Sequence, residues 1–198
     1  MSLTNQHRQT RREREHSATR VVILDAARRV AEREGARNLS LRAAAAEAGF
    51  TPAALYGYFR NKDELLLALA SDDLSGLARA IREAGVQSGG RLGAASAVAL
   101  DLLEKTETIA AASTALPSTA GSSDVERLFN GRLIAALTAL SDLMGEDASS
   151  REAQADVVLI AAALSGLALL SRSGRLGALG CSNEELLARL DKRFSSAG

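Results

Sequence analysis

The sequence predicts an all-α fold, because apolar residues recur at helical spacing along most of the chain. A clear run begins after Asn61, where Leu65, Leu66, Leu69 and Leu74 follow at such intervals. No stretch alternates polar and apolar residues as a half-buried strand would. Segments rich in glycine or serine interrupt the pattern at 85–93, 117–123 and 145–150, and we interpret them as loops.

The first 17 residues are polar and rich in arginine, with glutamates interleaved. We interpret 1–17 as a flexible basic arm, and two roles stay open for it. It is either a solvated tail, or an arm that contacts phosphates or enters a minor groove of DNA.

A first helix is predicted from about Ala18 to Glu34, where Gly35 ends it. Ile23, Ala27 and Val30 share one face of this helix. We expect that face to pack over the helices that follow.

The stretch from Ser40 to Leu65 has the start and stop signals of two short helices in close succession. Ser40 is a suitable N-cap for a helix from Leu41 to Ala48, and Gly49 is a suitable stop. Thr51 and Pro52 then restart a helix, with proline at its first position. Two helices joined by so short a turn meet at a steep angle, which is the geometry of a helix-turn-helix.

The second of these helices is predicted over Pro52–Tyr58. Ala53 and Ala54 at its start are too small to obstruct an approach to base edges. Asn61 and Glu64 have the spacing of a capping box at the start of a third, longer helix. Lys62 places a positive charge at the helix start, where the helix dipole disfavours it. A phosphate bound there by Lys62 and the free backbone N–H groups would explain the choice of lysine.

Formal net charge is zero, but the charges are unevenly distributed. Residues 1–62 hold 12 Arg and Lys against 6 Asp and Glu, and the rest of the chain has the opposite imbalance. The split favours a DNA-facing front, although chance clustering on a solvated face would look the same.

Several other classes of protein find no support in the sequence. With the single Cys181 and two histidines near the N-terminus, no disulfide and no metal site of ordinary spacing is expected, and no cofactor. No nucleophile–base pair is visible, so we do not expect an enzyme. The apolar run 157–170 is too short to span a membrane, and a cytoplasmic protein is expected.

The stretch from Ile23 to Leu65 carries a set of residues at fixed spacing. They are Ile23, Leu24, Asp25, Ala26, Ala27, Gly35, Ser40, Leu41, Ala45, Ala48, Gly49, Thr51, Pro52, Leu55, Tyr56, Tyr58, Phe59, Asn61, Lys62, Glu64 and Leu65. With these residues the stretch resembles the DNA-binding domain of TetR-family transcriptional regulators. The resemblance implies a DNA-binding domain over 18–63 and a helical effector-binding and dimerisation domain over 64–198.

The resemblance also implies the residues that contact DNA. Ala53 and Ala54 would lie nearest the base edges, and Thr51 could bond either a base or a phosphate. The residues expected to anchor phosphates are Ser40, Arg42, Tyr56, Tyr58 and Lys62.

The chain departs from the family pattern at three positions. Gly57 replaces what is often a larger polar residue, which puts half-site specificity in doubt. Ala31 and Ala44 stand where larger apolar residues are usual, so we expect a thinly packed small core. Either Leu39 or Phe50 fills the space, or the domain is only marginally stable without its partner.

Further helices are predicted at 61–83, 94–115, 124–144 and 152–172, with a last one capped by Asn183. By resemblance, the helices at 152–172 and 183–195 would form a homodimer interface, and the alternative is that they fill only the chain's own core. A small apolar effector is expected to bind in the rear domain. The residues proposed to contact it are Glu104, Glu107, Thr108 and Phe129.

The sequence thus predicts a dimeric, ligand-responsive repressor of a palindromic DNA operator. An alternative is a helical binding protein that has lost operator recognition and acts through protein or ligand contacts.

Overall fold

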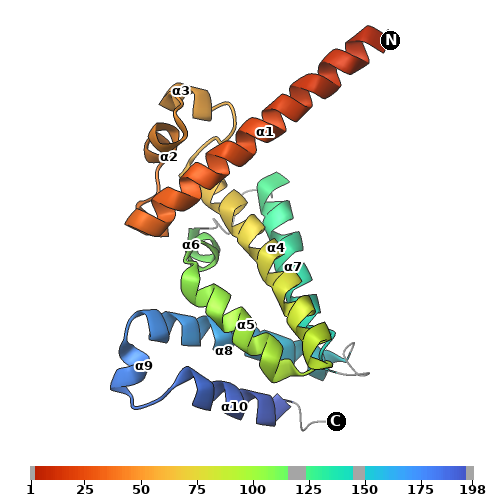
Figure 1. The fold of residues 1–198 in the computed structure, drawn as a ribbon, viewed down its shortest axis with the longest axis vertical. Coiled ribbons are helices and arrows are strands. Elements are labelled where there is room, and N and C mark those ends of the chain that lie inside the picture. Colours follow the sequence, from red (N-terminus) through yellow and green to blue (C-terminus); the bar gives the residue numbers. More distant parts are fainter. Residues whose placement is uncertain (1–2, 116–123, 145–149, 195–198) are drawn as a thin grey trace.

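The computed structural model describes residues 3–115, 124–144 and 150–194, and this part of the chain is helical without strands (Figure 1). The all-α prediction is confirmed. The elements are α1 Leu3–Glu34, the 3₁₀ turn η1 Ala36–Asn38, α2 Leu41–Ala48, α3 Pro52–Leu55, α4 Lys62–Ser88, α5 Leu92–Lys105, α6 Thr108–Ala115, α7 Asp124–Ser141, α8 Arg151–Arg172, α9 Arg175–Ala178 and α10 Asn183–Phe194.

Helix α1 is longer than expected and projects beyond the other helices (Figure 1). It begins at Leu3, so the predicted start at Ala18 is wrong, and residues 3–17 are helical where we expected a flexible arm. The alternating charges that suggested an arm also suit an exposed helix, since Arg11 and Glu15 pair at 2.7 Å across one turn. The boundaries of the domains stay a prediction.

The first three helices pack together at the front, and their buried side chains belong to a core that continues into the rear of the molecule. Ile23, Ala27 and Val30 are fully buried on the inner face of α1, as their spacing predicted. Leu39 is buried too and belongs to the same core as Ala31 and Ala44, whereas Phe50 is exposed. Of the two residues considered as fillers of this core, the structure therefore favours Leu39.

An ion-pair cluster joins α1 to α2. Glu47 on α2 accepts hydrogen bonds from Arg29 at 2.8 Å and from Arg33 at 3.2 Å. These hydrogen bonds, more than the charges themselves, lower the pKa of Glu47 below its ordinary value. The cluster fixes α2 against α1 and is partly open to solvent.

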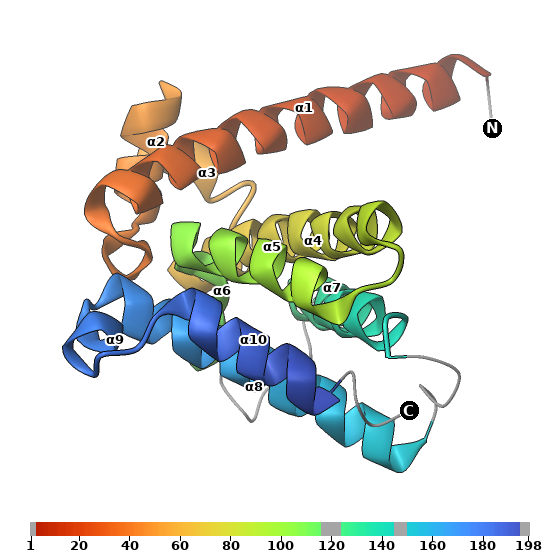
Figure 2. The same ribbon diagram turned by 60° about the horizontal axis from the view of Figure 1, so that its bottom comes forward.

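Helix α4 packs against α1 and runs on through the rear of the molecule (Figure 1). Helices α5, α6 and α7 pack against α4, and α8 packs across α5 and α7. Helix α10 lies on α5 and α8 (Figure 2). Helix α4 therefore belongs to both halves of the fold.

Several predicted helix limits in the rear half are wrong. Helix α4 continues to Ser88, and Gly85, expected in a loop, is buried within it, where a Cβ would come within 2.6 Å of Leu143 Cδ2. The helix predicted over 94–115 breaks at Thr106, whose backbone is extended. Ser182, rather than Asn183, caps α10 by accepting from the Glu185 N–H at 3.2 Å.

Within residues 3–115, 124–144 and 150–194, α8 alone is long and apolar enough to cross a membrane. Length and composition are weak evidence, because core helices of soluble proteins pass the same test. Only 22% of its apolar window is buried inside this chain. The window therefore carries exposed apolar surface that one chain does not cover.

Glu47→Gln should make the fold less sensitive to acid. Because the pKa of Glu47 is lowered in the folded state, its stabilising effect is present at neutral pH and is lost as the pH falls through that lowered value. Melting temperatures from pH 7 to pH 3 should therefore fall less steeply in the variant, from a lower starting point. Glu15→Gln, which removes an exposed pair within α1, is the control. Parallel curves for Glu47→Gln and wild type would contradict the assignment.

Candidate nucleic-acid interface

Three polar side chains define the starts of α2, α3 and α4. Ser40 Oγ accepts from the Ala43 N–H at 3.1 Å, Thr51 Oγ1 from Ala54 at 3.3 Å, and Asn61 Oδ1 from Glu64 at 2.8 Å. Gly49 ends α2 with a φ of 75°, a conformation that glycine adopts without strain. All three predicted caps are confirmed, and they mark where α2, α3 and α4 begin.

The start of α3 is a low, open surface. Ala53 and Ala54 are exposed, whereas Leu55 points inward and is fully buried. Tyr56 follows with 62% of its surface exposed. The hydroxyls of Ser40 and Thr51 each accept one backbone N–H, so their protons remain available for a phosphate or a base.

Helix α3 is shorter than the predicted Pro52–Tyr58. The Gly57 and Tyr58 N–H groups bond to carbonyls only three residues back, at 3.2 Å and 2.9 Å, which tightens the chain after Leu55. Gly57 is exposed, and a Cβ there would lie 3.3 Å from the Ala54 carbonyl oxygen. The exposed surface at 51–58 is therefore a single helical turn followed by a turn that carries the two tyrosines.

Tyr58 lies against α1. Its ring stacks on His16 with a centroid separation of 4.4 Å, and Arg20 lies over the Phe59 ring at 5.1 Å. We had placed His16 in the arm and missed both contacts. The spacing of His16, Arg20 and Ile23 could have indicated these contacts, because the three residues lie on one face of a helix. The contacts hold the half-buried Tyr58 in place while leaving part of it open to solvent.

The Lys62 ammonium donates to the carbonyl oxygen of Arg37 in the connection between α1 and α2. In this structure it therefore links the start of α4 to that connection. Its half-buried side chain still lies at the first turn of α4, as the phosphate prediction requires. Arg42 is exposed on α2. Contact of these residues with DNA stays a prediction.

A buried carboxylate joins the front of the molecule to the rear. Asp73 on α4, whose side chain is 9% exposed, forms an ion pair with Arg28 of α1. Its other oxygen accepts from the hydroxyls of Thr106, at 3.1 Å, and Thr108. These four residues are called the Asp73 network below. Burial lowers the pKa of Arg28, but the hydrogen bond and charge of Asp73 outweigh it, so the net shift is upward.

Three of the four residues predicted to bind a ligand line one cavity. Glu104, Glu107 and Thr108 border a space of about 340 Å³ between the end of α1, η1, the α5–α6 connection and α8. Phe129 does not line it, since its side chain is buried in the core with 1% exposure. Glu104 accepts from Asn183 at 2.6 Å. Whether any of the four binds a ligand stays a prediction.

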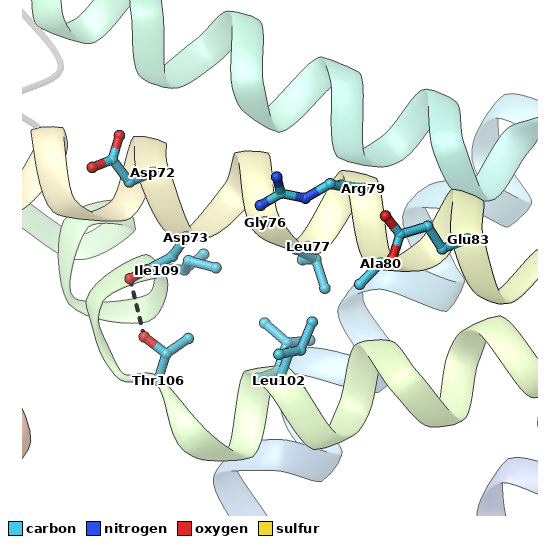
Figure 3. Close-up of a pocket in the computed structure, with 11 residues that line it drawn as sticks. Asp72, Asp73, Gly76, Leu77, Arg79, Ala80, Glu83, Leu102, Thr106 and Ile109 are labelled. Carbon is cyan, nitrogen blue, oxygen red and sulfur yellow. Dashed lines mark hydrogen bonds between the residues drawn. The ribbon is translucent and has the colours of Figure 1, made fainter.

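A second cavity of about 340 Å³ lies between α4, α5 and α6 (Figure 3). Leu77, Leu102 and Ile109 contribute its apolar side, and Asp73 and Thr106 close one end. Its walls combine side chains from three consecutive helices, and no local sequence pattern marks them as ligand-binding.

The N-terminal helices match known bacterial regulatory proteins in sequence. The family model described as bacterial regulatory proteins of the tetR family matches residues 23–69. The nicotine-responsive transcriptional repressor HdnoR of Paenarthrobacter nicotinovorans is 45% identical over 62 residues, which is 31% of this chain and 32% of that repressor. The match thus spans about a third of the relative's length and leaves its ligand-responsive activity untested in this chain.

Two solved structures share the fold over most of the chain. A protein of unknown function from Rhodococcus sp. RHA1 has a TM-score of 0.71 and 23% identity, over 89% of this chain and 93% of that one. The protein SCO4313, described as regulatory, has a TM-score of 0.68 and 20% identity, over 92% and 97% of the two chains. At these identities the likeness establishes the fold alone.

Tyr58→Phe tests the predicted phosphate contact. Phenylalanine preserves the ring stack on His16, so the melting temperature should stay unchanged. Loss of one hydrogen bond to a charged phosphate should weaken duplex binding about tenfold. Fluorescence anisotropy with a labelled duplex measures the affinity, and Tyr56→Phe serves as the comparison. Unaltered affinity in Tyr58→Phe would make Tyr58 a purely structural residue.

Proposed function

We propose that this chain, whose residues 23–69 match the model of the tetR family of bacterial regulatory proteins, is a transcriptional repressor that binds a palindromic operator as a homodimer. The observation that carries the proposal is the exposed start of α3. This helix end is capped by Thr51 and exposes the small side chains of Ala53 and Ala54. Tyr56, Tyr58 and Lys62 follow it in the chain. Such an end can enter a major groove.

The residues divide into two roles in this proposal. Ala53 and Ala54 approach base edges, where their methyl groups suit the methyl group of thymine, and Thr51 bonds a base or a phosphate. The residues that fix the position of the protein by contacting phosphates are Ser40, Arg42, Tyr56, Tyr58 and Lys62.

Exposed apolar side chains on α8 support the homodimer. Val158, Leu159 and Leu169 are each 56–57% exposed within a single chain. A second copy, packing α8 and α10 against their equivalents, would cover them in a four-helix bundle. A symmetric pair then presents two copies of α3 to two half-sites of a palindrome.

A small effector that binds in the rear half is proposed to release the operator. The cavity between α4, α5 and α6 supports this role because α4 runs from it towards the front helices, and the other cavity is bordered directly by α1 and η1. The proposed compartment is the cytoplasm, where such a repressor meets DNA.

The exposed Gly57, which offers DNA no side chain, favours the alternative of a binding protein without operator recognition.

The direct test is selection of a random duplex library by the purified protein at physiological salt, followed by sequencing of the retained duplexes. We expect an enriched palindrome whose half-sites are separated by about one helical turn. Retention without enrichment would contradict operator recognition and favour the alternative.

Lys62→Ala should weaken binding to all duplexes alike. Loss of one phosphate contact reduces the slope of log affinity against log salt by about one unit. Anisotropy titrations over a salt series, with the enriched duplex and a scrambled one, measure this effect. Asp63→Asn, at the next position and exposed, is the control. A change in sequence preference with an unchanged slope would show that Lys62 does not contact phosphate.

Val158→Glu should separate the proposed dimer. A carboxylate placed in an apolar interface costs several kcal/mol when it has no partner. Light scattering should report a monomer for the variant and a dimer for wild type. Val86→Glu, at another highly exposed position, should leave the dimer intact. A dimeric Val158→Glu protein would exclude this face of α8 from the interface.

A further inference from the structure

The cavity between α4, α5 and α6 has an apolar side and a charged end (Figure 3). Leu77, Leu102 and Ile109 make the apolar side, whereas Asp73 and Thr106 lie at one end. Asp73 is therefore both a wall of this cavity and the centre of the Asp73 network. A ligand in the cavity would lie directly beside the contact that joins α4 to α1.

A smaller apolar cavity of about 60 Å³ continues inward from this one. Leu77, Leu103 and Ile109 line both spaces, and the inner one is otherwise enclosed by apolar side chains of α4, α5, α7 and α8, together with Ser165. Movement of these three flexible side chains would join the two. The combined site suits a molecule with one polar end and one apolar end.

The charges that line the cavity between α4, α5 and α6 determine which polar group a ligand can carry. Its ionisable lining residues are three carboxylates, on Asp72, Asp73 and Glu83, and one guanidinium, on Arg79. Figure 3 shows Glu83 on the same side of α4 as Leu77 and Ala80. An anionic ligand would face net negative charge, so the lining favours a cation.

Asp73 adds a second reason for a cation. A buried carboxylate that loses its ion-pair partner is strongly destabilising unless another positive group replaces that partner. A neutral or anionic ligand cannot replace Arg28, whereas an ammonium group can.

We propose that this cavity binds amphipathic cations, whose positive group competes with Arg28 for Asp73 while the apolar part lies along Leu77, Leu102 and Ile109. That such a ligand is the effector rests on the proposed repressor function. Its binding would free α1 from α4 and thereby alter the position of α3.

The binding test uses n-octylamine, n-octanoate and n-octanol as probes of equal chain length, with calorimetry on the full chain in the absence of DNA. Octylamine is protonated at neutral pH and should bind, and the other two should bind at least about tenfold more weakly. Preferential binding of octanoate, or equal binding of all three, would overturn the proposal.

A pair of glycine substitutions tests the location. Gly76 lines the cavity, and a Cβ there would meet no atom within 4 Å, so Gly76→Leu should fill the cavity without a backbone clash. Gly131→Leu on the exposed part of α7 is the matched control, since a Cβ there is equally unobstructed. Octylamine binding should be lost in Gly76→Leu and kept in Gly131→Leu. Equal binding by the two variants would place the site elsewhere.

Arg28→Ala tests the competition. Removing the competing cation should tighten octylamine binding about tenfold or more and increase its stabilising effect on the melting temperature. Should Arg28→Ala not fold, Arg28→Lys should tighten binding by a smaller factor, because the more strongly hydrated lysine ammonium is a weaker partner than a guanidinium for a buried carboxylate. Unchanged or weaker binding in the folded variant would contradict competition for Asp73.

These outcomes are separate from the test of repressor function. Calorimetry contains no DNA, and the duplex selection contains no amine. An enriched palindrome without octylamine binding would overturn the ligand class alone. Octylamine binding without an enriched palindrome would overturn the repressor alone.

Discussion

The continuity of α4 is the constraint on which the rest of the structure depends. Its first turn is fixed to the front by the Asn61 cap and by the bond from Lys62 to the Arg37 carbonyl. Its later turns form the centre of the rear half, against α5, α6 and α7. The Asp73 network then joins the middle of α4 to α1. We propose that a displacement of α4 in the rear is transmitted through these contacts to the helices that carry α3.

The front of the molecule was predictable because short-range rules determine it. Ser40, Thr51 and Asn61 each bond a backbone group three residues away, so the sequence contains both partners of each cap. The contacts missed there join distant residues, as in the stack of His16 on Tyr58. Helix α1 also extends further than predicted, since a charged helix and a charged arm have similar composition.

The rear half was less predictable for the same reason. The break between α5 and α6 has neither glycine nor proline. We attribute it to Thr106 and Thr108, whose hydroxyls donate hydrogen bonds to the carboxylate of Asp73, more than thirty residues earlier. Cavity walls likewise combine α4, α5 and α6, so no local pattern marks them. Phe129 looked suitable for a ligand by its position on α7, but it lies in the core.

Operator affinity of Gly76→Leu, compared with Gly131→Leu, tests most directly whether the rear cavity is coupled to DNA reading. A leucine in the cavity imitates the apolar part of a bound ligand, and both substitutions replace a helical glycine by the same residue. Coupling through α4 predicts that Gly76→Leu binds the enriched duplex more weakly, while Gly131→Leu binds like wild type. Equal affinity of all three proteins would contradict the coupling.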